Sequence, residues 1–247
     1  MIEFIDVNKN YGDIVGLSHA NIKIDKGDFV FLVGPSGAGK TTFVRLILRE
    51  IEADSGKILV NDTDITKLTR REIPALRQKI GMVFQDFRLL DKKTVYENVA
   101  FALEITHEKK KQIKKRVPEV LELVGISDKI NRYPKELSAG EQQRVGIARA
   151  IINNPRVLIC DEPTGNLDPS TAMDIMNLLE KINLRGTTII MVTHAKDIVD
   201  HFNKRVVTIE NGTIRRDDSK GEYRYEMPTD EDFYIKLKEE TNYEKSR

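Results

Sequence analysis

The sequence predicts an α/β fold built on a parallel sheet that carries a phosphate-binding loop. An apolar run, Phe29–Val33, leads straight into a glycine-rich stretch, and apolar residues at helical spacing follow it. A second apolar run, Val157–Cys160, ends in two adjacent carboxylates, which is typical of a buried parallel strand that ends at a site. Apolar and polar residues alternate near the N-terminus, which predicts an antiparallel β subdomain. A long helical pattern farther along predicts an inserted α-helical subdomain.

The glycine-rich stretch fits the phosphate-loop pattern G-x-x-x-x-G-K-[ST] at every specified position. Its residues are Gly34, Pro35, Ser36, Gly37, Ala38, Gly39, Lys40 and Thr41, and Thr42 follows directly. Glycines let backbone N–H groups turn inward around phosphate oxygens, and the N-terminus of the next helix adds partial positive charge. We expect Lys40 to reach the β- and γ-phosphates and the Thr41 hydroxyl to bind Mg²⁺. An accidental glycine-rich turn is the alternative, and the flanking strand and helix argue against it.

Length and composition set the outer limits. The chain has 247 residues, enough for one large α/β domain or a domain with a sizeable subdomain. The net charge is only +1, which offers no global basic field for nucleic acid. No secretory signal is visible, and no apolar run approaches the ~20 residues that span a bilayer. Cys160 is the only cysteine, which fits a reducing cytosol, so a cytoplasmic location is expected.

Residues near the N-terminus predict antiparallel strands. Apolar positions in Ile2–Val7 open one strand, and apolar and polar residues alternate over positions 20–24 in a second. Tyr11 lies between them, before a glycine. Its ring is a candidate to stack on a purine base, although tyrosine is also common in turns. A turn signal at residues 54–56 precedes one further strand at residues 57–60.

From about residue 66 to residue 150 the pattern becomes helical. Apolar residues recur at helical spacing over positions 95–103 and again over positions 113–124. Pro118 is expected to start or kink the second of these helices. The basic run Lys109–Arg116 is interpreted as a solvated helix face, with contact to anionic lipid or an acidic partner as the alternative.

Gln85 begins a segment that carries Phe87, Leu89 and Leu90. Exposed apolar side chains are unusual in a simple linker and natural on a docking surface. The alternative is that these side chains pack into the helical region.

Ser138 begins another predicted helix. It is a favourable N-cap residue, and Glu141, three residues later, completes a capping box. Taken alone, the segment is an ordinary helix start.

The strand at Val157–Cys160 delivers two carboxylates with different expected roles. Asp161 is placed to hold Mg²⁺ directly or through water, and Glu162 is the natural general base for a water that attacks the γ-phosphate. A β-branched run at residues 187–193 brings His194 to the same sheet edge, although a lone histidine after a strand is usually structural. Farther on, residues 206–212 predict a strand, a turn and a return strand.

Together these motifs resemble an ATP-binding-cassette (ABC) ATPase subunit. The resemblance covers residues 1 to about 216, and its elements in order are Tyr11, the phosphate loop, Gln85, Leu137–Glu141, Asp161 and Glu162, the turn ending at Asp168, and His194. The segments Phe84–Leu90 and Asp161–Asp168 are most similar to cell-division members of the family. One departure is Ala139, which stands where the family usually has glycine. If that position needs a positive φ, alanine adds about 1 kcal/mol or more of strain.

The resemblance implies a P-loop NTPase core with the ABC ATPase fold and two copies that sandwich two ATP molecules head to tail. Each site then combines the phosphate loop of one copy with Ser138 and Gly140 of the other. The remaining implied roles are catalysis for Glu162, His194 and Gln85, Mg²⁺ binding for Thr41, Gln85 and Asp161, and nucleotide binding for Tyr11 and Asp168.

The resemblance to cell-division members implies a homodimer that drives conformational change in an FtsX-like integral membrane protein. The chain is then peripheral on the inner face of the cell membrane. The alternative is the ATPase subunit of an exporter for lipoproteins or small amphiphiles. A third class, cassettes that act on nucleic acid or ribosomes, usually has two cassettes or a long coiled-coil insertion, so we expect no nucleic-acid partner.

Beyond residue 216 the resemblance thins. Residues 217–247 are highly charged with scattered aromatic residues, and residues 230–240 have a short helical pattern. We interpret this segment as a loosely packed extension, with partner binding or dimer contact as the alternative.

Overall fold

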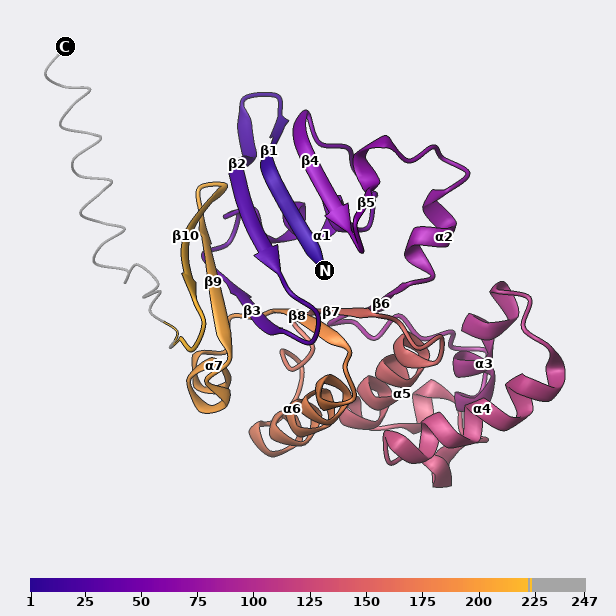
Figure 1. Cartoon of the computed structure of the whole chain (residues 1–247). Coiled ribbons are helices and arrows are strands. Elements are labelled where there is room, and N and C mark those ends of the chain that lie inside the picture. Colours follow the sequence, from indigo (N-terminus) through magenta and orange to yellow (C-terminus); the bar gives the residue numbers. More distant parts are fainter. Residues whose placement is uncertain (222, 224–247) are drawn as a thin grey trace, which may run out of the picture.

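The computed structural model describes residues 1–221 and 223. Two sheets form the framework, one of six strands and one of four (Figure 1). Helix α1 (Lys40–Ile47) contributes side chains to the core between them, and the larger helices cover the opposite face of the six-stranded sheet. The predicted α/β fold with a parallel sheet is confirmed.

The six-stranded sheet has the strand order β10-β9-β3-β8-β7-β6. Its strands are β3 (Phe29–Val33), β6 (Ile80–Val83), β7 (Val157–Asp161), β8 (Thr188–Val192), β9 (Arg205–Glu210) and β10 (Thr213–Asp218). Neighbours from β9 to β6 are parallel, so their carboxyl ends meet at one edge. Strand β10 returns antiparallel to β9 after the turn Asn211-Gly212, as predicted.

The four-stranded sheet is antiparallel, which confirms the predicted β subdomain. It consists of β1 (Ile2–Tyr11), β2 (Ile14–Ile24), β4 (Ser55–Val60) and β5 (Thr63–Asp64) in the order β2-β1-β4-β5. Each neighbouring pair runs antiparallel.

The main sheet is buried on both faces because successive side chains of a strand point to opposite sides. Within β3, Phe31 belongs to the core on the helical side, and Leu32 belongs to the core on the side of the antiparallel sheet. In the latter core the ring of Phe4 from β1 stacks on Phe43 of α1 with centroids 4.3 Å apart. This stacking ties the β subdomain to the helix that follows the phosphate loop.

Five helices pack against the other face of the main sheet (Figure 1). They are α3 (Val95–Ile105), α4 (Lys110–Leu123), α5 (Ala139–Ile151), α6 (Pro169–Leu184) and α7 (Lys196–Phe202). Short elements complete the chain: α2 (Ile73–Arg77) and the 3₁₀ turns Ile65–Lys67, Ser127–Lys129 and Pro134–Glu136. Across the described part of the chain, every helix is too short or too polar to cross a membrane.

Two expectations for residues 66–150 need correction. The segment is not helical throughout, because β6 lies within it and pairs with β7 in the main sheet. A four-residue apolar run gives no periodicity that separates a buried strand from a helix. The second concerns Pro118, which was expected to start or kink its helix: α4 begins at Lys110 and continues through the proline, so Pro118 does not start it.

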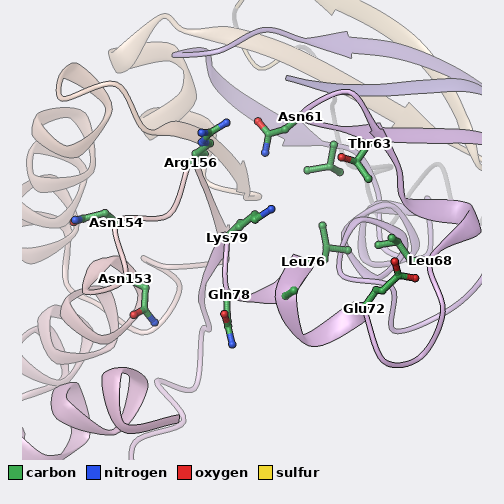
Figure 2. Close-up of a pocket in the computed structure, with 12 residues that line it drawn as sticks. Asn61, Thr63, Leu68, Glu72, Leu76, Gln78, Lys79, Asn153, Asn154 and Arg156 are labelled. Carbon is green, nitrogen blue, oxygen red and sulfur yellow. The ribbon is translucent and has the colours of Figure 1, made fainter. Parts of the chain in front are cut away.

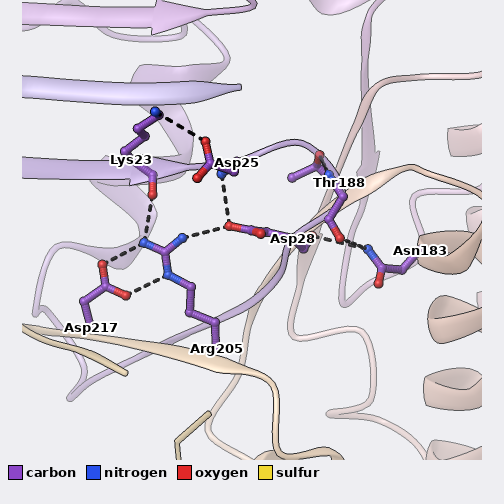
Figure 3. A network of polar contacts seen from close by, with 8 residues as sticks. Lys23, Asp25, Asp28, Asn183, Thr188, Arg205 and Asp217 are labelled. Carbon is purple, nitrogen blue, oxygen red and sulfur yellow. Dashed lines mark hydrogen bonds and ion pairs between the residues drawn. The ribbon is translucent and has the colours of Figure 1, made fainter. Parts of the chain in front are cut away.

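Arg205 connects the amino edge of the main sheet to the antiparallel sheet (Figure 3). Its Nη1 donates to Asp28 Oδ2 at 2.8 Å, and its Nη2 donates to the Lys23 carbonyl at 2.8 Å. Its Nε and Nη2 each donate to Asp217 at 2.7 Å. Asp28 is just before β3, Lys23 is in β2 and Asp217 is in β10, so one guanidinium joins four segments.

The packed region continues beyond residue 216. Strand β10 ends at Asp218, and the Gly221 N–H donates to the Lys204 carbonyl at 3.1 Å. Tyr223 is buried against the helical-side core, and its N–H donates to Asp200 Oδ1 at 2.5 Å. The predicted loose extension and the short helix at residues 230–240 otherwise lie outside the described residues.

Candidate nucleotide site

Most of the predicted site residues gather at the carboxyl edge of the main sheet. Strand β3 ends at the phosphate loop, β7 ends at Asp161, and β8 ends two residues before His194. Leu32 of β3 and Asp161 of β7 both align with Val192 of β8, so these strand ends are neighbours. Gln85 follows β6 at the same edge.

The phosphate loop needs glycine where the backbone is left-handed and closely packed. Gly34 has φ 144° and Gly39 has φ 112°. A Cβ on Gly34 would lie 2.0 Å from the Ile209 carbonyl oxygen, and one on Gly39 would lie 2.3 Å from that of Gly16. Any side chain at these two positions would therefore displace the backbone of a neighbouring strand.

Lys40 is the first residue of α1 and lies folded into its own loop. Its Nζ donates to the carbonyls of Gly34 and Pro35 at 2.7 and 2.8 Å. Burial lowers the pKa of Lys40, and the nearby Glu162 and Asp161 carboxylates oppose that shift. The ammonium group is thus held over the loop, where a phosphate would meet it.

Tyr11 lies at the end of β1, beside the helical end of the loop. Its Oη is 3.5 Å from Thr42 Oγ1 and its side chain is 41% exposed. A cavity of about 170 Å³ lies between Tyr11 and the loop, and its wall includes Gly37, Lys40 and Thr41. The structure therefore brings the predicted aromatic platform together with the loop that it is expected to serve.

Asp161 and Glu162 are held partly out of water. Burial is the main cause that raises the pKa of each carboxyl group above its ordinary value. Glu162 also adopts a left-handed backbone with φ 47°, which is uncommon outside glycine and asparagine. Its N–H donates to the Val192 carbonyl at 3.0 Å, so the turn after β7 is anchored to β8.

His194 contacts Glu162 directly. Its Nε2 lies 3.3 Å from Glu162 Oε1, and its backbone N–H donates to Glu162 Oε2 at 3.3 Å. Burial, followed by the positive charge of Lys40, lowers the pKa of His194, which favours the neutral ring. The side chain of Glu162 is 19% exposed, so this carboxylate faces a restricted space with a histidine on one side.

Gln85 is exposed and lies beside the turn that follows Glu162. Its carbonyl accepts a hydrogen bond from Asn166 Nδ2 at 3.0 Å. Its Nε2 is 3.0 Å from the place that a Cβ on Gly165 would occupy. Farther along that turn, Asp168 caps α6 by accepting from the N–H groups of Ser170 and Thr171. Hydrogen bonds from those two residues lower the pKa of Asp168.

Ser138 and Gly140 lie at the start of α5, away from the phosphate loop of the same chain, and Gly140 is buried. Ser138 is exposed, and it forms the predicted capping box with Glu141. No hydrogen bond among the described residues joins Ser138 or Gly140 to the phosphate loop of the same chain. Ala139 is the first residue of α5 and does not have a positive φ, so the strain considered from the sequence is absent.

Two polar residues of α5 that sequence patterns did not single out join the site segments. Gln143 is fully buried, and its Nε2 donates to the Pro163 carbonyl, next to Glu162, at 2.8 Å. Arg149 donates to the carbonyls of Phe87 and Arg88, just after Gln85. The only sequence signal is that Gln143 occupies an apolar position on the buried face of the helix.

A separate cavity of about 470 Å³ lies at the opposite, amino edge of the main sheet (Figure 2). Lys79 and Arg156, which immediately precede β6 and β7, line it together with Asn61 and Leu76. None of the predicted site residues lines this cavity. This cavity is therefore separate from the site that the motifs predict.

The sequence model of the ABC transporter family matches residues 17–165, which is more than half of the chain. The chain belongs to the ABC transporter family. This ABC ATPase has the phosphate loop, the paired carboxylates and the histidine at one sheet edge, and its identification as an ATPase of this family is confirmed.

Several curated relatives that match this chain over nearly their whole length share one name. The ABC ATPase is 52% identical over 227 residues to the cell division ATP-binding protein FtsE of Streptococcus pneumoniae, covering 92% of this chain and 99% of that one. It is 54% identical over 224 residues to FtsE of Bacillus subtilis, covering 90% and 98%. The resemblance to cell-division members of the family is thereby confirmed.

Solved structures of cassettes share the fold. One is a dimeric ATP-binding cassette in a post-hydrolysis state bound to ADP and Pi, with a TM-score of 0.79 and 33% identity, covering 92% of this chain and 100% of that one. Another is a cassette from Clostridium perfringens that is part of an ABC transporter complex, with a TM-score of 0.83, 33% identity and 88% coverage of both chains.

The residues present fit a magnesium ion that is shared with phosphate oxygens. Mg²⁺ prefers oxygen ligands and usually binds through one or two carboxylates together with substrate phosphates. Asp161 offers a carboxylate and Thr41 a hydroxyl at this edge. The buried Glu162 Oε1 lies 3.3 Å from His194 Nε2 but accepts no hydrogen bond from the described residues. Within the described residues no cluster of three or more His, Cys, Asp or Glu would hold a metal unaided. A shared site is therefore the kind that these donors support.

Proposed function

We propose that this ABC ATPase dimerises on ATP and drives conformational change in an FtsX-like integral membrane protein during cell division. The observation that carries the proposal is the 52% identity to FtsE over 99% of that relative's length. The family model matches residues 17–165, and the longer match to FtsE also includes strands β8, β9 and β10, which complete the main sheet. ATP and Mg²⁺ are the proposed cofactors, and the inner face of the cell membrane is the proposed location.

Within one chain, the proposed role of each residue follows from its position at the carboxyl edge of the main sheet. Lys40 holds the β- and γ-phosphates, and Thr41, Asp161 and Gln85 hold Mg²⁺, which supplies charge neutralisation on the phosphates. Glu162 accepts the proton of the attacking water, and its raised pKa brings it nearer to the pH at which a base works best. The neutral His194 beside Glu162 orients that carboxylate and contacts the γ-phosphate.

The second half of each site comes from the other copy, in this proposal. Ser138 and Gly140 stand at the start of α5, where N–H groups and the helix dipole favour an anion. An exposed helix dipole contributes only about 0.3–1 kcal/mol, while charge-assisted hydrogen bonds contribute roughly 1.5–3 kcal/mol each. Taking a dimer from mostly open to mostly closed needs about 5.5 kcal/mol. Two sites with such hydrogen bonds reach that value, and hydrolysis removes the γ-phosphate that makes them.

Shared sites have a direct test in mixed dimers. Lys40→Ala removes the phosphate contact and Ser138→Arg blocks the α5 surface, so each variant alone is expected to be inactive. Mixed together, the two chains build one site from an intact phosphate loop and an intact Ser138, and part of the ATPase activity should return. Full activity of Ser138→Arg on its own would remove the basis for shared sites.

The segment after Gln85 is the proposed contact with the membrane partner. Phe87 is half-buried and belongs to neither hydrophobic core, while Leu89 packs against the helical-side core. We propose that both help to form a socket for a short cytoplasmic helix of the FtsX-like protein, since such a helix is held by a few apolar anchors. Each lost anchor costs about 2 kcal/mol or more of binding free energy.

A pull-down of the FtsX-like protein with Phe87→Ala/Leu89→Ala tests the function and the socket together. We expect capture of the partner by the unchanged chain and strongly weakened capture by the double variant, with ATP binding retained. Circular dichroism checks folding, because an unfolded variant would mean that these residues are core. A folded variant with normal capture would place the socket elsewhere, and an unchanged chain that captures no FtsX-like protein would contradict the function.

The alternative function, the ATPase subunit of a transporter, has support from other relatives. The chain is 48% identical over 202 residues to the methionine import ATP-binding protein MetN of Carboxydothermus hydrogenoformans, but it covers only 60% of that protein. An exporter for lipoproteins or small amphiphiles is the form of this alternative that the motifs suggest. Full-length coverage of FtsE favours the cell-division proposal.

A further inference from the structure

Arg149 lies on α5 and binds the backbone just after Gln85. Its Nη1 donates to the Arg88 carbonyl at 2.6 Å, and its Nη2 donates to the Phe87 carbonyl at 2.9 Å. The Arg149 side chain is partly buried, which strengthens its hydrogen bonds and lowers its pKa. None of the carboxylates in the described structure lies within 4.0 Å of it, so these two carbonyls are its polar partners.

The backbone that Arg149 holds is strained. Phe87 and Arg88 both adopt left-handed conformations, with φ 57° and 47°. The Arg88 N–H donates to the Asp86 carbonyl at 2.6 Å, which closes a tight turn around Phe87. Two consecutive residues of this kind persist only where the surroundings fix them.

Gln85 is therefore held from two sides. Asn166, four residues after Glu162, donates to the Gln85 carbonyl at 3.0 Å. Arg149 fixes the turn that begins immediately beyond Gln85. Gly146 of α5 faces the same turn, because a Cβ at this position would lie 3.8 Å from the Phe87 carbonyl oxygen, in ordinary van der Waals contact.

We propose that Arg149 is a positioning residue for Gln85 of its own chain. Its two hydrogen bonds keep the turn at Phe87 and Arg88 in the form that places the Gln85 side chain beside Gly165 and the Glu162 turn. The inference rests on the proposed role of Gln85 at the nucleotide. It predicts that Arg149 acts on the site to which its own Gln85 belongs and leaves the function of Ser138, at the other end of α5, intact.

Mixed dimers separate these two effects. In a dimer of Ser138→Arg and Lys40→Ala chains, the working site takes Gln85 from the Ser138→Arg chain and Ser138 from the Lys40→Ala chain. Arg149→Lys is placed on one chain or the other, since lysine keeps the charge but loses the fixed two-pronged geometry. On the Ser138→Arg chain it should lower kcat about tenfold or more, with KM for ATP nearly unchanged. On the Lys40→Ala chain it should leave kcat unchanged.

Arg144→Lys is the matched control, because Arg144 also lies on α5 and donates to a carbonyl, that of Val124, at 2.7 Å. It should leave kcat unchanged on either chain. A loss that is equal in both placements of Arg149→Lys would mean a general weakening of α5, and no loss in either would mean that Gln85 needs no such support. Both results would overturn the inference.

Hydrogen–deuterium exchange of the Arg149→Lys variant alone tests the positioning role even if the nucleotide sites are not shared between two chains. Exchange should rise in a peptide that spans residues 84–90 and stay unchanged in one that spans residues 139–147. Unchanged exchange over residues 84–90 would overturn the positioning role, whereas failure of the unsubstituted mixed dimer to recover activity would count against the proposed dimer alone.

Discussion

At the residue scale, Glu162 combines restricted exposure, an uncommon backbone conformation and a histidine neighbour. Its left-handed φ of 47° turns the chain directly after β7, and the N–H bond to Val192 holds that turn in place. Such strain is characteristic of functional sites, where the surrounding structure fixes it. The arrangement aims a carboxylate with a raised pKa into the space above the phosphate loop.

Glu162→Gln is the first prediction at this scale. Glutamine keeps the shape and most of the contacts but accepts no proton, and general base catalysis contributes about 10²- to 10⁴-fold. ATP hydrolysis should therefore fall by about a hundredfold or more, while ATP binding persists. Phosphate release and nucleotide binding are the two measurements, and near-normal hydrolysis would show that Glu162 is not the base.

In the absence of nucleotide, the same Glu162→Gln substitution should also change the stability of the chain in a pH-dependent way. Burial raises the pKa of Glu162, so folding disfavours its charged form. Below the pKa that Glu162 has in the unfolded chain, its carboxyl group is neutral in both states and burial costs no stability. Above its pKa in the folded chain, the full cost of burying the charged carboxylate applies. Glu162→Gln should thus raise Tm at neutral pH, with a difference that shrinks as the pH falls through the folded pKa. A difference that grows at low pH would contradict this reasoning.

At the element scale, the amino edge of the main sheet depends on Arg205. Its guanidinium joins β9 to β10, to the residue before β3 and to the end of β2 (Figure 3). The hydrogen bonds that Arg205 donates to Asp217 are the main cause that raises its pKa, and those to Asp28 add to the rise, while burial opposes it. Elements that are distant in the sequence are thus fixed to one another at the edge opposite the nucleotide.

Arg205→Leu should destabilise the chain because it leaves Asp28 and Asp217 without their shared partner. Hydrogen bonds to charged groups contribute about 1.5–3 kcal/mol, so a loss of about 2–3 kcal/mol in the free energy of unfolding is expected. Urea denaturation measures it. Lys23→Ala is the control, since Lys23 pairs with Asp25 at 3.6 Å between side chains that are 63% and 65% exposed, and its loss should cost under about 1 kcal/mol. Equal losses for the two variants would argue against a special role for Arg205.

At the scale of the whole molecule, the proposed function assigns nucleotide binding to two separate parts of one chain. The carboxyl edge of the sheet carries Lys40, Asp161 and Glu162, while Ser138 stands at the exposed start of α5. A head-to-tail pair would bring each surface of one copy to the other surface of its partner. The hydrogen bonds across such an interface depend on the γ-phosphate, so its lifetime should depend on the rate of hydrolysis.

Glu162→Gln should therefore accumulate as a dimer when ATP is present. Size-exclusion chromatography should give a monomer without nucleotide, a dimer with ATP and a monomer with ADP. Adding Ser138→Arg to the same chain should abolish the dimer, because it blocks the surface that meets the γ-phosphate. A dimer that persists in the doubly substituted chain would place the interface elsewhere.

Local patterns were sufficient for the elements whose chemistry is contained in a short stretch. The phosphate loop from Gly34 to Thr41, the capping box at Ser138 and the turn at Asn211 are each specified by neighbouring residues, and the structure has all three. The carboxylates after β7 were predictable for a related reason: the carboxyl ends of parallel strands meet at one edge whatever the details of packing.

Tertiary structure alone decided what depends on contacts between distant segments. Strand β6 is recognisable only by its pairing with β7, because four apolar residues have no distinctive period. Arg149 is a helical residue like many others until α5 lies against the turn after Gln85. The conformation of Ala139 likewise follows from where α5 begins, since a backbone torsion depends on the hydrogen bonds of the folded chain and not on residue type alone.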